Sequence, residues 1–184
     1  MNDFKKIGTF AKSVTRKNLD KKSSADVYSV TKYDGFVRSL DYFKKQVFSR
    51  DLSTYKIIKK GEFAYSTIHL DEGAIGLFRN DEGLISPMYT VFKVDESIDI
   101  FYLNHLLSSD LLLSKYGLIG QGSVNRRKSI PFSSFANLEV RIPTLPEQTK
   151  IAKILTGLST LIDFYELKII KLKNVKKSTL NLLT

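Results

Sequence analysis

The sequence predicts an α+β fold, in which a mixed, sheet-rich domain with packed helices is followed by a long C-terminal coiled-coil helix. Short β-branched and aromatic runs alternate with turn residues over the first half of the chain, which is typical of strands. Residues 100–113 then carry apolar side chains at helical spacing. From Glu147 to Thr184 no proline occurs, and apolar residues recur at steps of three and four.

The N-terminal part favours several short strands joined by polar turns. Residues 4–14 predict a short strand or turn, and residues 13–24 predict a polar, exposed loop. Residues 27–30 have the β-branched and aromatic composition of a strand, and the chain turns at 32–36. Residues 63–65 predict a further strand after a turn that ends at Gly61.

The middle of the chain is expected to be mostly sheet. Residues 74–78 and 84–94 form two apolar runs, separated by the turn sequence Asn80-Asp81-Glu82-Gly83. A turn of this kind between two strand-like runs predicts a β-hairpin.

An amphipathic helix is expected from Ile100. It either continues through residues 108–110 or restarts there, and it is expected to end at Gly117. Three glycines at 117, 120 and 122 then predict a loosely held loop that ends in three consecutive cations. Residues 138–142 alternate as a final strand, which Pro143 ends.

A long helix is expected to begin at a capping box formed by Thr144 and Glu147. About 37 residues make a rod of ~55 Å at 1.5 Å per residue. Such a rod favours a second helix as its partner over a fold back onto its own sheet. We therefore divide the chain into a domain at 1–143 and a helical dimerisation region at 144–184. The apolar stripe of the helix consists of Ile151, Leu155, Leu158, Ile162, Tyr165, Ile169 and Leu172.

The composition restricts the class of protein. The chain has 184 residues and 42% hydrophobic residues, including 12 Phe and 9 Tyr, which is enough to fill a core. Because Cys is absent, disulfides, thiolate zinc sites and a cysteine nucleophile are excluded, and a cytoplasmic location is expected. The apolar stretches are too short to cross a bilayer, so no membrane association is expected.

The charge is unevenly distributed along the chain. The formal net charge is +10, yet residues 1–60 hold 15 basic against 6 acidic groups, whereas residues 61–110 hold 2 against 9. Such a separation attracts a polyanion to the basic segments, and nucleic acid is the obvious polyanion. On charge alone, a merely solubilising role for the lysines explains the excess equally well.

No catalytic, nucleotide or metal site is visible in the sequence. The motifs of phosphate-binding loops are absent, and His69 and His105 lack a partner at the spacing of a helical metal pair. His69, Asp71 and Glu72 could bind a cation, although a polar turn before Gly73 explains them more simply. We therefore expect no catalytic residue, metal or cofactor in this chain.

Four runs of residues together resemble a known family. They are Gly-Glu-Phe-Ala-Tyr-Ser at 61–66, Gly-Ala-Ile-Gly at 73–76, Gly-Leu-Ile-Ser-Pro-Met-Tyr-Thr-Val-Phe at 83–92, and Ile-Pro-Thr-Leu-Pro-Glu-Gln-Thr-Lys-Ile-Ala-Lys-Ile-Leu at 142–155. In these runs the chain is similar to a half-length specificity subunit of a type I restriction-modification system. It carries one target recognition domain and one spacer helix, where members of the family usually carry two of each.

The resemblance implies a DNA-reading subunit that catalyses nothing itself. Its partners would be double-stranded DNA, the methyltransferase (modification) subunit, the restriction subunit, and a second half that is either a copy of this chain or another half-length subunit. S-adenosylmethionine would bind the modification subunit, which methylates an adenine. Antiparallel pairing of two halves would imply an interrupted palindrome as the target.

The candidate DNA-binding residues follow from this expectation. Phosphate contacts are expected from Lys17, Lys21, Lys44, Lys45 and Lys128. Base reading is expected from Lys32, Arg38, Arg50, Gln121, Asn125, Arg126 and Arg127, because Arg suits guanine and Asn or Gln suits adenine. Tyr33 and Tyr65 are expected to stack on bases or touch thymine methyl groups. The alternative for each is a solvated surface residue, and the loop at 121–128 is the main candidate.

Two rival interpretations remain. The chain could be a stand-alone dimeric DNA-binding regulator, in which the helix only dimerises and recruits no enzyme. It could also be a small nuclease with an unrecognised metal site, in which case the purified chain would cleave DNA with magnesium.

Overall fold

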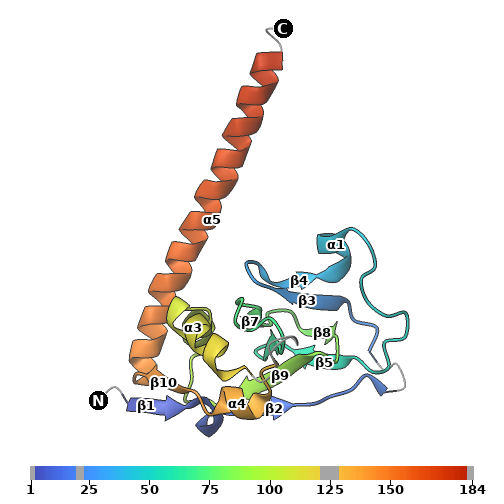
Figure 1. Cartoon of the computed structure of the whole chain (residues 1–184). Helices are drawn as coiled ribbons and strands as arrows, with labels where there is room; N and C mark the ends of the chain where they lie inside the picture. Colours follow the sequence, from blue (N-terminus) through green and yellow to red (C-terminus); the bar gives the residue numbers. More distant parts are fainter. Residues whose placement is uncertain (1–2, 20–22, 121–128, 182–184) are drawn as a thin grey trace.

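The computed structural model describes residues 3–19, 23–120 and 129–181 (Figure 1). Its strands are β1 (Asp3–Lys6), β2 (Ala11–Val14), β3 (Val27–Thr31), β4 (Gly35–Arg38), β5 (Lys56–Lys59), β6 (Phe63–Ser66), β7 (Ile75–Leu77), β8 (Glu82–Ile85), β9 (Tyr89–Val94) and β10 (Glu139–Ile142). Its helices are η1 (Ile7–Thr9), α1 (Ser39–Phe43), α2 (Ile100–Leu107), α3 (Asp110–Ile119), α4 (Phe132–Ala136) and α5 (Leu145–Asn181). The mixed strands and helices, followed by one long helix, confirm the α+β prediction.

The strands form three sheets. Strands β2-β9-β6-β7 make an antiparallel sheet, and β4-β3-β8-β5 make a mixed sheet in which β3 and β8 run parallel. Strands β1 and β10 pair separately, so that the N-terminal strand lies beside the last strand of the domain. Residues 3–6 and 139–142, far apart in sequence, therefore close the domain just before α5 begins.

Strand β6 lies between two cores, because its side chains alternate between the two faces of its sheet. Phe63 and Tyr65 pack with α2, α3 and α4 in the main core, where Phe63 stacks on Phe92 at a ring distance of 5.2 Å. Ala64 points the other way, into the core that joins the two four-stranded sheets. The domain thus has helices, sheet and sheet as successive layers.

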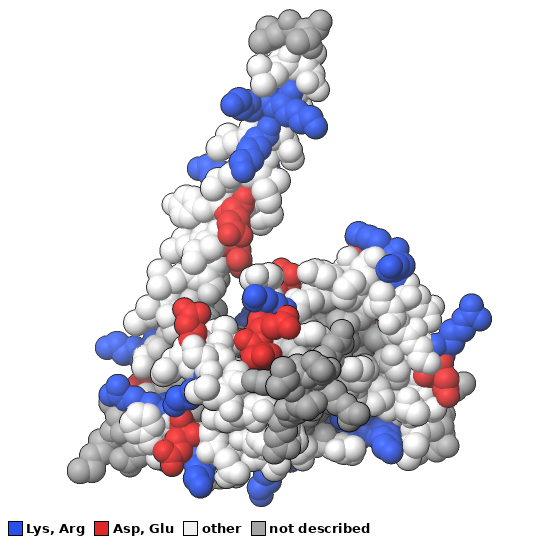
Figure 2. All heavy atoms as spheres, in the orientation of Figure 1, with Lys and Arg blue, Asp and Glu red and all other residues white. Residues whose placement is uncertain are grey.

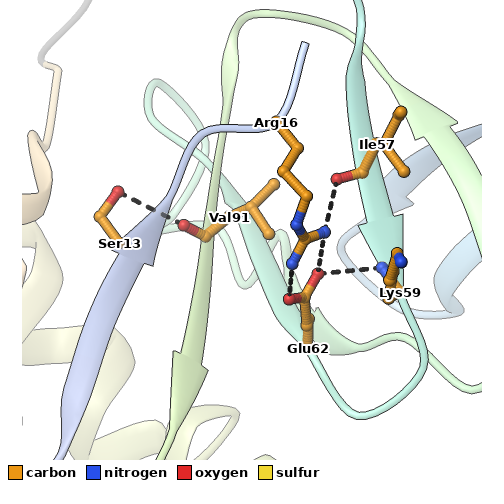
Figure 3. A network of polar contacts seen from close by, with 6 residues as sticks. All are labelled: Ser13, Arg16, Ile57, Lys59, Glu62 and Val91. Carbon is orange, nitrogen blue, oxygen red and sulfur yellow. Dashed lines mark hydrogen bonds and ion pairs between the residues drawn. The ribbon is translucent and has the colours of Figure 1, made fainter. Parts of the chain in front are cut away.

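One ion pair links the ends of the two larger sheets (Figure 3). Arg16, just after β2, pairs with the carboxylate of Glu62, which precedes β6. Its guanidinium also donates to the carbonyl of Ile57 in β5 at 3.2 Å, and Glu62 accepts the amide of Lys59 at 2.9 Å. The pair therefore fixes the β5–β6 turn against the chain that leaves β2.

The predicted hairpin between residues 74–78 and 84–94 is wrong. Strand β7 pairs with β6, whereas β8 pairs with β5 and β3 in the other sheet. The second run is itself two strands, because β8 and β9 belong to different sheets and Pro87 lies between them. The turn residues therefore mark a crossing between sheets, not a hairpin.

Gly83 is required for packing, since a Cβ there would lie 2.6 Å from Phe78 Cζ and 2.7 Å from Tyr28 Cδ2. We expect Gly83→Ala to lower the free energy of unfolding by about 1–3 kcal/mol through overpacking. Gly157→Ala is the matched control, because nothing lies within 4 Å of a Cβ at that helical position. Chemical denaturation should show the control variant equal to or more stable than the parent.

The helical predictions are mostly confirmed, with shifted ends. The chain does restart between α2 and α3, as residues 108–110 allowed, but α3 continues past Gly117 to Ile119. Asp99 is the N-cap of α2, and its Oδ1 accepts the amides of Phe101 and Tyr102, each at 3.0 Å. The short helix α4 was not expected from the sequence. The final strand is confirmed as β10.

The capping box at the start of α5 is half realised. The Glu147 carboxylate accepts hydrogen bonds from the Thr144 amide at 3.0 Å and from the Thr144 hydroxyl at 2.8 Å. The bond from the amide is the one that a capping box predicts for this glutamate. The hydroxyl thus donates to Glu147, where the box predicted that it accepts an amide. Both bonds lower the pKa of Glu147, and the bond from the Thr144 hydroxyl contributes more than the bond from the Thr144 amide.

Helix α5 projects from the domain after its first turns (Figure 1). Of its 37 residues only Gln148 and Ala152 are buried, and residues 157–181 are all exposed. A fold back onto its own sheet is therefore excluded. Cations gather toward the far end of the rod (Figure 2), where Lys168, Lys171, Lys173, Lys176 and Lys177 are exposed.

Candidate nucleic-acid interface

A hollow of about 300 Å³ lies where three loops meet the mixed sheet. We call it the aromatic hollow. Its apolar and aromatic lining gives flat surfaces on which a base or a ribose could rest, and its serines and histidine supply hydrogen-bonding groups. It is lined by Val27, Tyr28, Ser29, Val47, Phe48, Tyr55, Ser66, Ile68, His69, Ser86, Met88 and Tyr89.

The walls of the aromatic hollow are held by backbone-directed bonds. The Thr67 hydroxyl donates to the Met88 carbonyl at 3.2 Å, and the Thr67 carbonyl accepts the Ile130 amide at 2.8 Å. On another wall the Ser49 amide donates to the Tyr55 hydroxyl at 3.2 Å. The segment that begins at 129 is thereby tied beside the loop that carries Met88.

Two like charges stand next to this hollow. Lys17 and Lys56 are partners in an isolated antiparallel bridge, and the Lys56 ammonium donates to the carbonyl of Tyr89 at 2.5 Å. Burial, and then the charge of Lys17, lower the pKa of Lys56. Within the described part of the chain, no carboxylate forms an ion pair with either lysine. A phosphate of a bound polyanion would relieve this repulsion, which makes the pair a candidate phosphate contact.

Lys56→Met tests that interpretation. Since the variant removes a partly desolvated charge, we expect its free energy of unfolding to stay within ~0.5 kcal/mol of the parent or to rise. Duplex DNA affinity should fall, and the slope of log K against log salt should decrease by about 1. Lys93→Met, at the other end of β9, is the control. An unchanged salt slope in Lys56→Met would remove Lys56 from the interface.

The other sequence-predicted cations surround the hollow unevenly. Lys44, Lys45 and Arg50 are exposed around the loop that carries Val47 and Phe48. Lys44 has a positive φ of 55° and ends α1, so its backbone is fixed by the helix end. These three residues remain predictions as DNA contacts.

The β3–β4 hairpin carries two more predicted residues at its tip. Tyr33 is 83% exposed, and the Lys32 ammonium lies 5.1 Å from the centre of its ring. Arg38, at the other end of β4, already pairs with Asp26 at 2.7 Å and with Asp41 at 3.4 Å. To read a guanine it would have to exchange carboxylates for the base, so it is the weakest of the predicted base readers.

The prediction for Tyr65 is wrong. Its side chain is 0% exposed, because it points from β6 into the main core against Phe92 and Phe135. Its hydroxyl donates to the Ile130 carbonyl at 3.1 Å, and burial raises its pKa to about 12. Tyr65 therefore positions the chain beside the hollow and cannot stack on a base.

Several predicted residues lie outside the described residues: Lys21, Gln121, Asn125, Arg126, Arg127 and Lys128. Conversely, sequence reasoning missed Lys56, Phe48, Met88 and Tyr89 as members of the site. Interleaved aromatic residues and cations at 42–48 and 55–58 were a signal for Phe48 and Lys56. For Met88 and Tyr89 the signal was Ser86-Pro87-Met88, which breaks the strand pattern and indicates a loop.

The described residues offer no cluster of three or more His, Asp or Glu that could hold a metal ion. His69 Nδ1 lies 2.9 Å from Glu72 Oε1, within the turn expected from the sequence. His105 Nε2 lies 3.1 Å from the Thr156 hydroxyl on α5, so it packs between two helices. No helix in the described ranges is both long enough and apolar enough to cross a membrane.

Helix α5 presents its predicted apolar stripe to solvent. All seven stripe residues are exposed, from Leu155 at 37% to Leu172 at 60%. Further large apolar side chains outside the stripe are also exposed, which the heptad pattern did not predict. They include Leu161, Phe164, Leu167 and Ile170. A helix that is apolar on most sides needs more than one neighbour to cover it.

Comparisons with known proteins agree on one family. The sequence model described as "Type I restriction modification DNA specificity domain" matches residues 2–174. No curated protein sequence matches the chain.

Solved structures share the fold. The HsdS subunit from Thermoanaerobacter tengcongensis is similar at 15% identity and a TM-score of 0.64, over 88% of this chain and 43% of that chain. The type I restriction-modification S subunit from M. genitalium is similar at 13% identity and a TM-score of 0.54, over 86% and 39%. A structure described under complex assembly and conformational transition of the type I R-M system is similar at 13% identity and a TM-score of 0.57, over 88% of this chain and 39% of that chain.

This chain spans less than half the length of each of these structures. The family match, however, extends over nearly its whole length. The chain therefore belongs to the family of type I restriction modification DNA specificity domains.

Proposed function

We propose that this chain is a DNA-reading half of a type I restriction-modification specificity subunit. It binds double-stranded DNA in a sequence-specific manner and makes or breaks no covalent bond itself. The observation that carries this proposal is the family match over residues 2–174, together with a fold similar to one part of longer specificity subunits.

The DNA lies against the aromatic hollow and its surrounding cations. The pair of like charges at Lys17 and Lys56 and the exposed Lys44, Lys45 and Arg50 support this placement. Cations position the phosphate backbone, and side chains of the loops read base edges.

Two halves pair through α5 to read a two-part target. The exposed apolar stripe on α5 supports such pairing, since an apolar helix face of this kind normally packs against another element. The second half is a copy of this chain or another half-length subunit. Antiparallel packing of two identical halves gives the assembly two-fold symmetry, and the target is then an interrupted palindrome.

Partner subunits supply the chemistry. The modification subunit binds S-adenosylmethionine and methylates adenine, and the restriction subunit cleaves. The exposed apolar residues of α5 outside the stripe support contact with such a partner. The domain at 1–143 reads DNA in this proposal, and the region at 144–184 assembles the complex in the cytoplasm.

Methylome sequencing of the host tests the proposal. The expected result is an adenine-methylated motif in two parts with a fixed gap, which is lost when the gene for this chain is deleted. A host methylome that does not depend on this chain would contradict the proposal.

Co-purification separates the proposal from its rival. A specificity subunit retains a methyltransferase subunit during purification, whereas a stand-alone dimeric regulator does not. Purified chain with magnesium is expected to leave DNA uncut, and specific cutting would instead indicate a nuclease.

A further inference from the structure

A buried polar contact joins the base of α5 to the start of α2. Gln148 is 1% exposed, and both polar atoms of its side-chain amide form hydrogen bonds. Its Oε1 accepts the Asp99 amide at 2.9 Å, and its Nε2 donates to the carbonyls of Ser97 at 3.2 Å and Pro143 at 3.0 Å. The Gln148 side chain thus binds Ser97 in the loop before α2, the N-cap residue of α2, and the chain just before α5.

Two threonines extend this contact along the helix. The Thr149 hydroxyl donates to Asp99 Oδ2 at 2.9 Å, while the other oxygen of Asp99 caps α2. Two turns further, the Thr156 hydroxyl lies 3.1 Å from His105 Nε2 at the end of α2. We call Gln148, Thr149 and Thr156, with Asp99 and His105, the helix clamp.

The helix clamp continues into the sheet that borders the aromatic hollow. Asn104, on α2, accepts the amide of Leu77 in β7 at 2.9 Å through its side-chain oxygen. Strand β7 pairs with β6, and β6 pairs with β9, which begins at Tyr89 beside the hollow. The direction of α5 is therefore fixed relative to the candidate DNA-binding surface by a series of directional bonds.

We infer that Gln148, Thr149 and Thr156 are positioning residues that fix the angle between α5 and the recognition domain, and thereby the number of unread base pairs in the gap of the target. This inference rests on the proposed function, because the gap is defined only when two halves read one DNA. It assigns a role to a hydrogen-bonded joint, separate from the residues that read bases and from the stripe that pairs the helices.

The required precision explains why the joint is polar, with Gln148 buried and the other members half-buried. A small domain is roughly 30 Å across, and one base pair occupies ~3.4 Å of the DNA axis. A tilt of about 6° at the joint therefore moves the reading surface by one base pair. Apolar contacts alone are non-directional, whereas several partly buried hydrogen bonds restrict the angle. In this interpretation the sequence Pro-Glu-Gln-Thr at 146–149 encodes the joint.

The test compares threonine-to-valine variants of the full chain in complex with its modification subunit. Thr149→Val with Thr156→Val removes two bonds between helices, whereas Thr160→Val removes only a bond to the Thr156 carbonyl within α5. Each complex is offered a pool of duplexes that carry the two half-sites from the wild-type methylome, with the gap varied one base pair at a time.

We expect the double variant to lose discrimination between gaps. The affinity for duplexes with the preferred gap is compared with the affinity for duplexes whose gap is one base pair longer or shorter. In the double variant this ratio should fall at least ~5-fold, or the preferred gap length should change. Thr160→Val should keep the parental ratio. Affinity for a duplex with one half-site should be unchanged, which a general loss of folding would not permit. An unchanged ratio in the double variant overturns the inference and leaves the proposed function intact.

A second measurement needs no DNA. Because the chain has no Cys, spin labels can be placed at Asp71→Cys and Lys171→Cys, with labelled chain diluted in unlabelled chain. In the double variant, the distribution of distances between the label at 71 in the domain and the label at 171 on α5 should broaden. In Thr160→Val it should not. An equally narrow distribution in both also overturns the inference. If the wild-type methylome contains no two-part motif, the proposed function fails as well.

Discussion

If two copies of this chain pair as proposed, Leu158→Glu is expected to convert the pair into monomers. Leu158 is 52% exposed in the centre of the α5 stripe, and pairing would bury it in both chains. Burying one leucine contributes about 1.5–3 kcal/mol, so two copies together account for roughly 4 kcal/mol, or about a thousand-fold in Kd. A glutamate adds the cost of desolvating a charge. Analytical ultracentrifugation across a concentration series measures the change.

Leu167→Glu is the matched control. Leu167 is 61% exposed and lies nine residues further along α5, which at about 100° per residue is the opposite side of the helix. We expect it to change the Kd of self-association less than ~3-fold. Under the proposed function it instead weakens retention of the modification subunit. Equal loss of pairing in both variants would show that the stripe does not define the interface.

The sequence predicted the elements whose signals are local. Alternation at 138–142, the break between the two middle helices and the reach of Glu147 back to Thr144 are all set within a few residues, and each is observed. The long helix was also predictable, because its spacing repeats over many turns.

The errors concern partners that are distant in sequence. Gly83 was assigned to a turn from its sequence, yet the glycine is needed because Phe78 and Tyr28 occupy the space of a side chain. Tyr65 was correctly placed in a strand with Phe63, but the sequence did not show which face of that strand is covered, and in β6 Tyr65 points into the main core. Neither outcome can be read from a window of residues, because strand pairing decides both.

The candidate site shows the same limit. Exposed cations in loops could be identified from charge alone, and Lys17, Lys44, Lys45 and Arg50 are indeed exposed. The pairing of Lys56 with Lys17 could not be identified in this way, because the two lysines meet across an isolated bridge between distant parts of the chain. The helix clamp was equally hidden, since Gln148 and Asp99 are 49 residues apart.

Glu62→Gln is expected to destabilise the domain by about 2–3 kcal/mol. The Glu62 side chain is 8% exposed and holds both Arg16 and the Lys59 amide, so the variant leaves a guanidinium without its counter-charge (Figure 3). Breaking a fully buried pair costs ~3–5 kcal/mol, and the smaller value applies because Arg16 is 35% exposed and regains some water. Urea denaturation measures the loss.

The exposed pair of Lys60 and Asp81, at 3.7 Å, provides the control. Asp81→Asn makes the same change from carboxylate to amide in the neighbouring turn, and it should cost less than ~0.5 kcal/mol. A double-mutant cycle with Arg16→Met should give a coupling energy of about 1–3 kcal/mol for Arg16 and Glu62. A cost for Glu62→Gln no larger than that for Asp81→Asn would show that the pair does not join the sheets.

The same variant links stability to the candidate DNA-binding surface. Arg16 precedes Lys17, and its guanidinium holds the carbonyl of Ile57, which follows Lys56. The ion pair therefore fixes both ends of the bridge on which the two like charges stand. At a temperature where Glu62→Gln is still folded, we expect DNA affinity to fall although no side chain of the proposed interface has changed. Unaltered affinity there would mean that the lysines keep their positions without the ion pair.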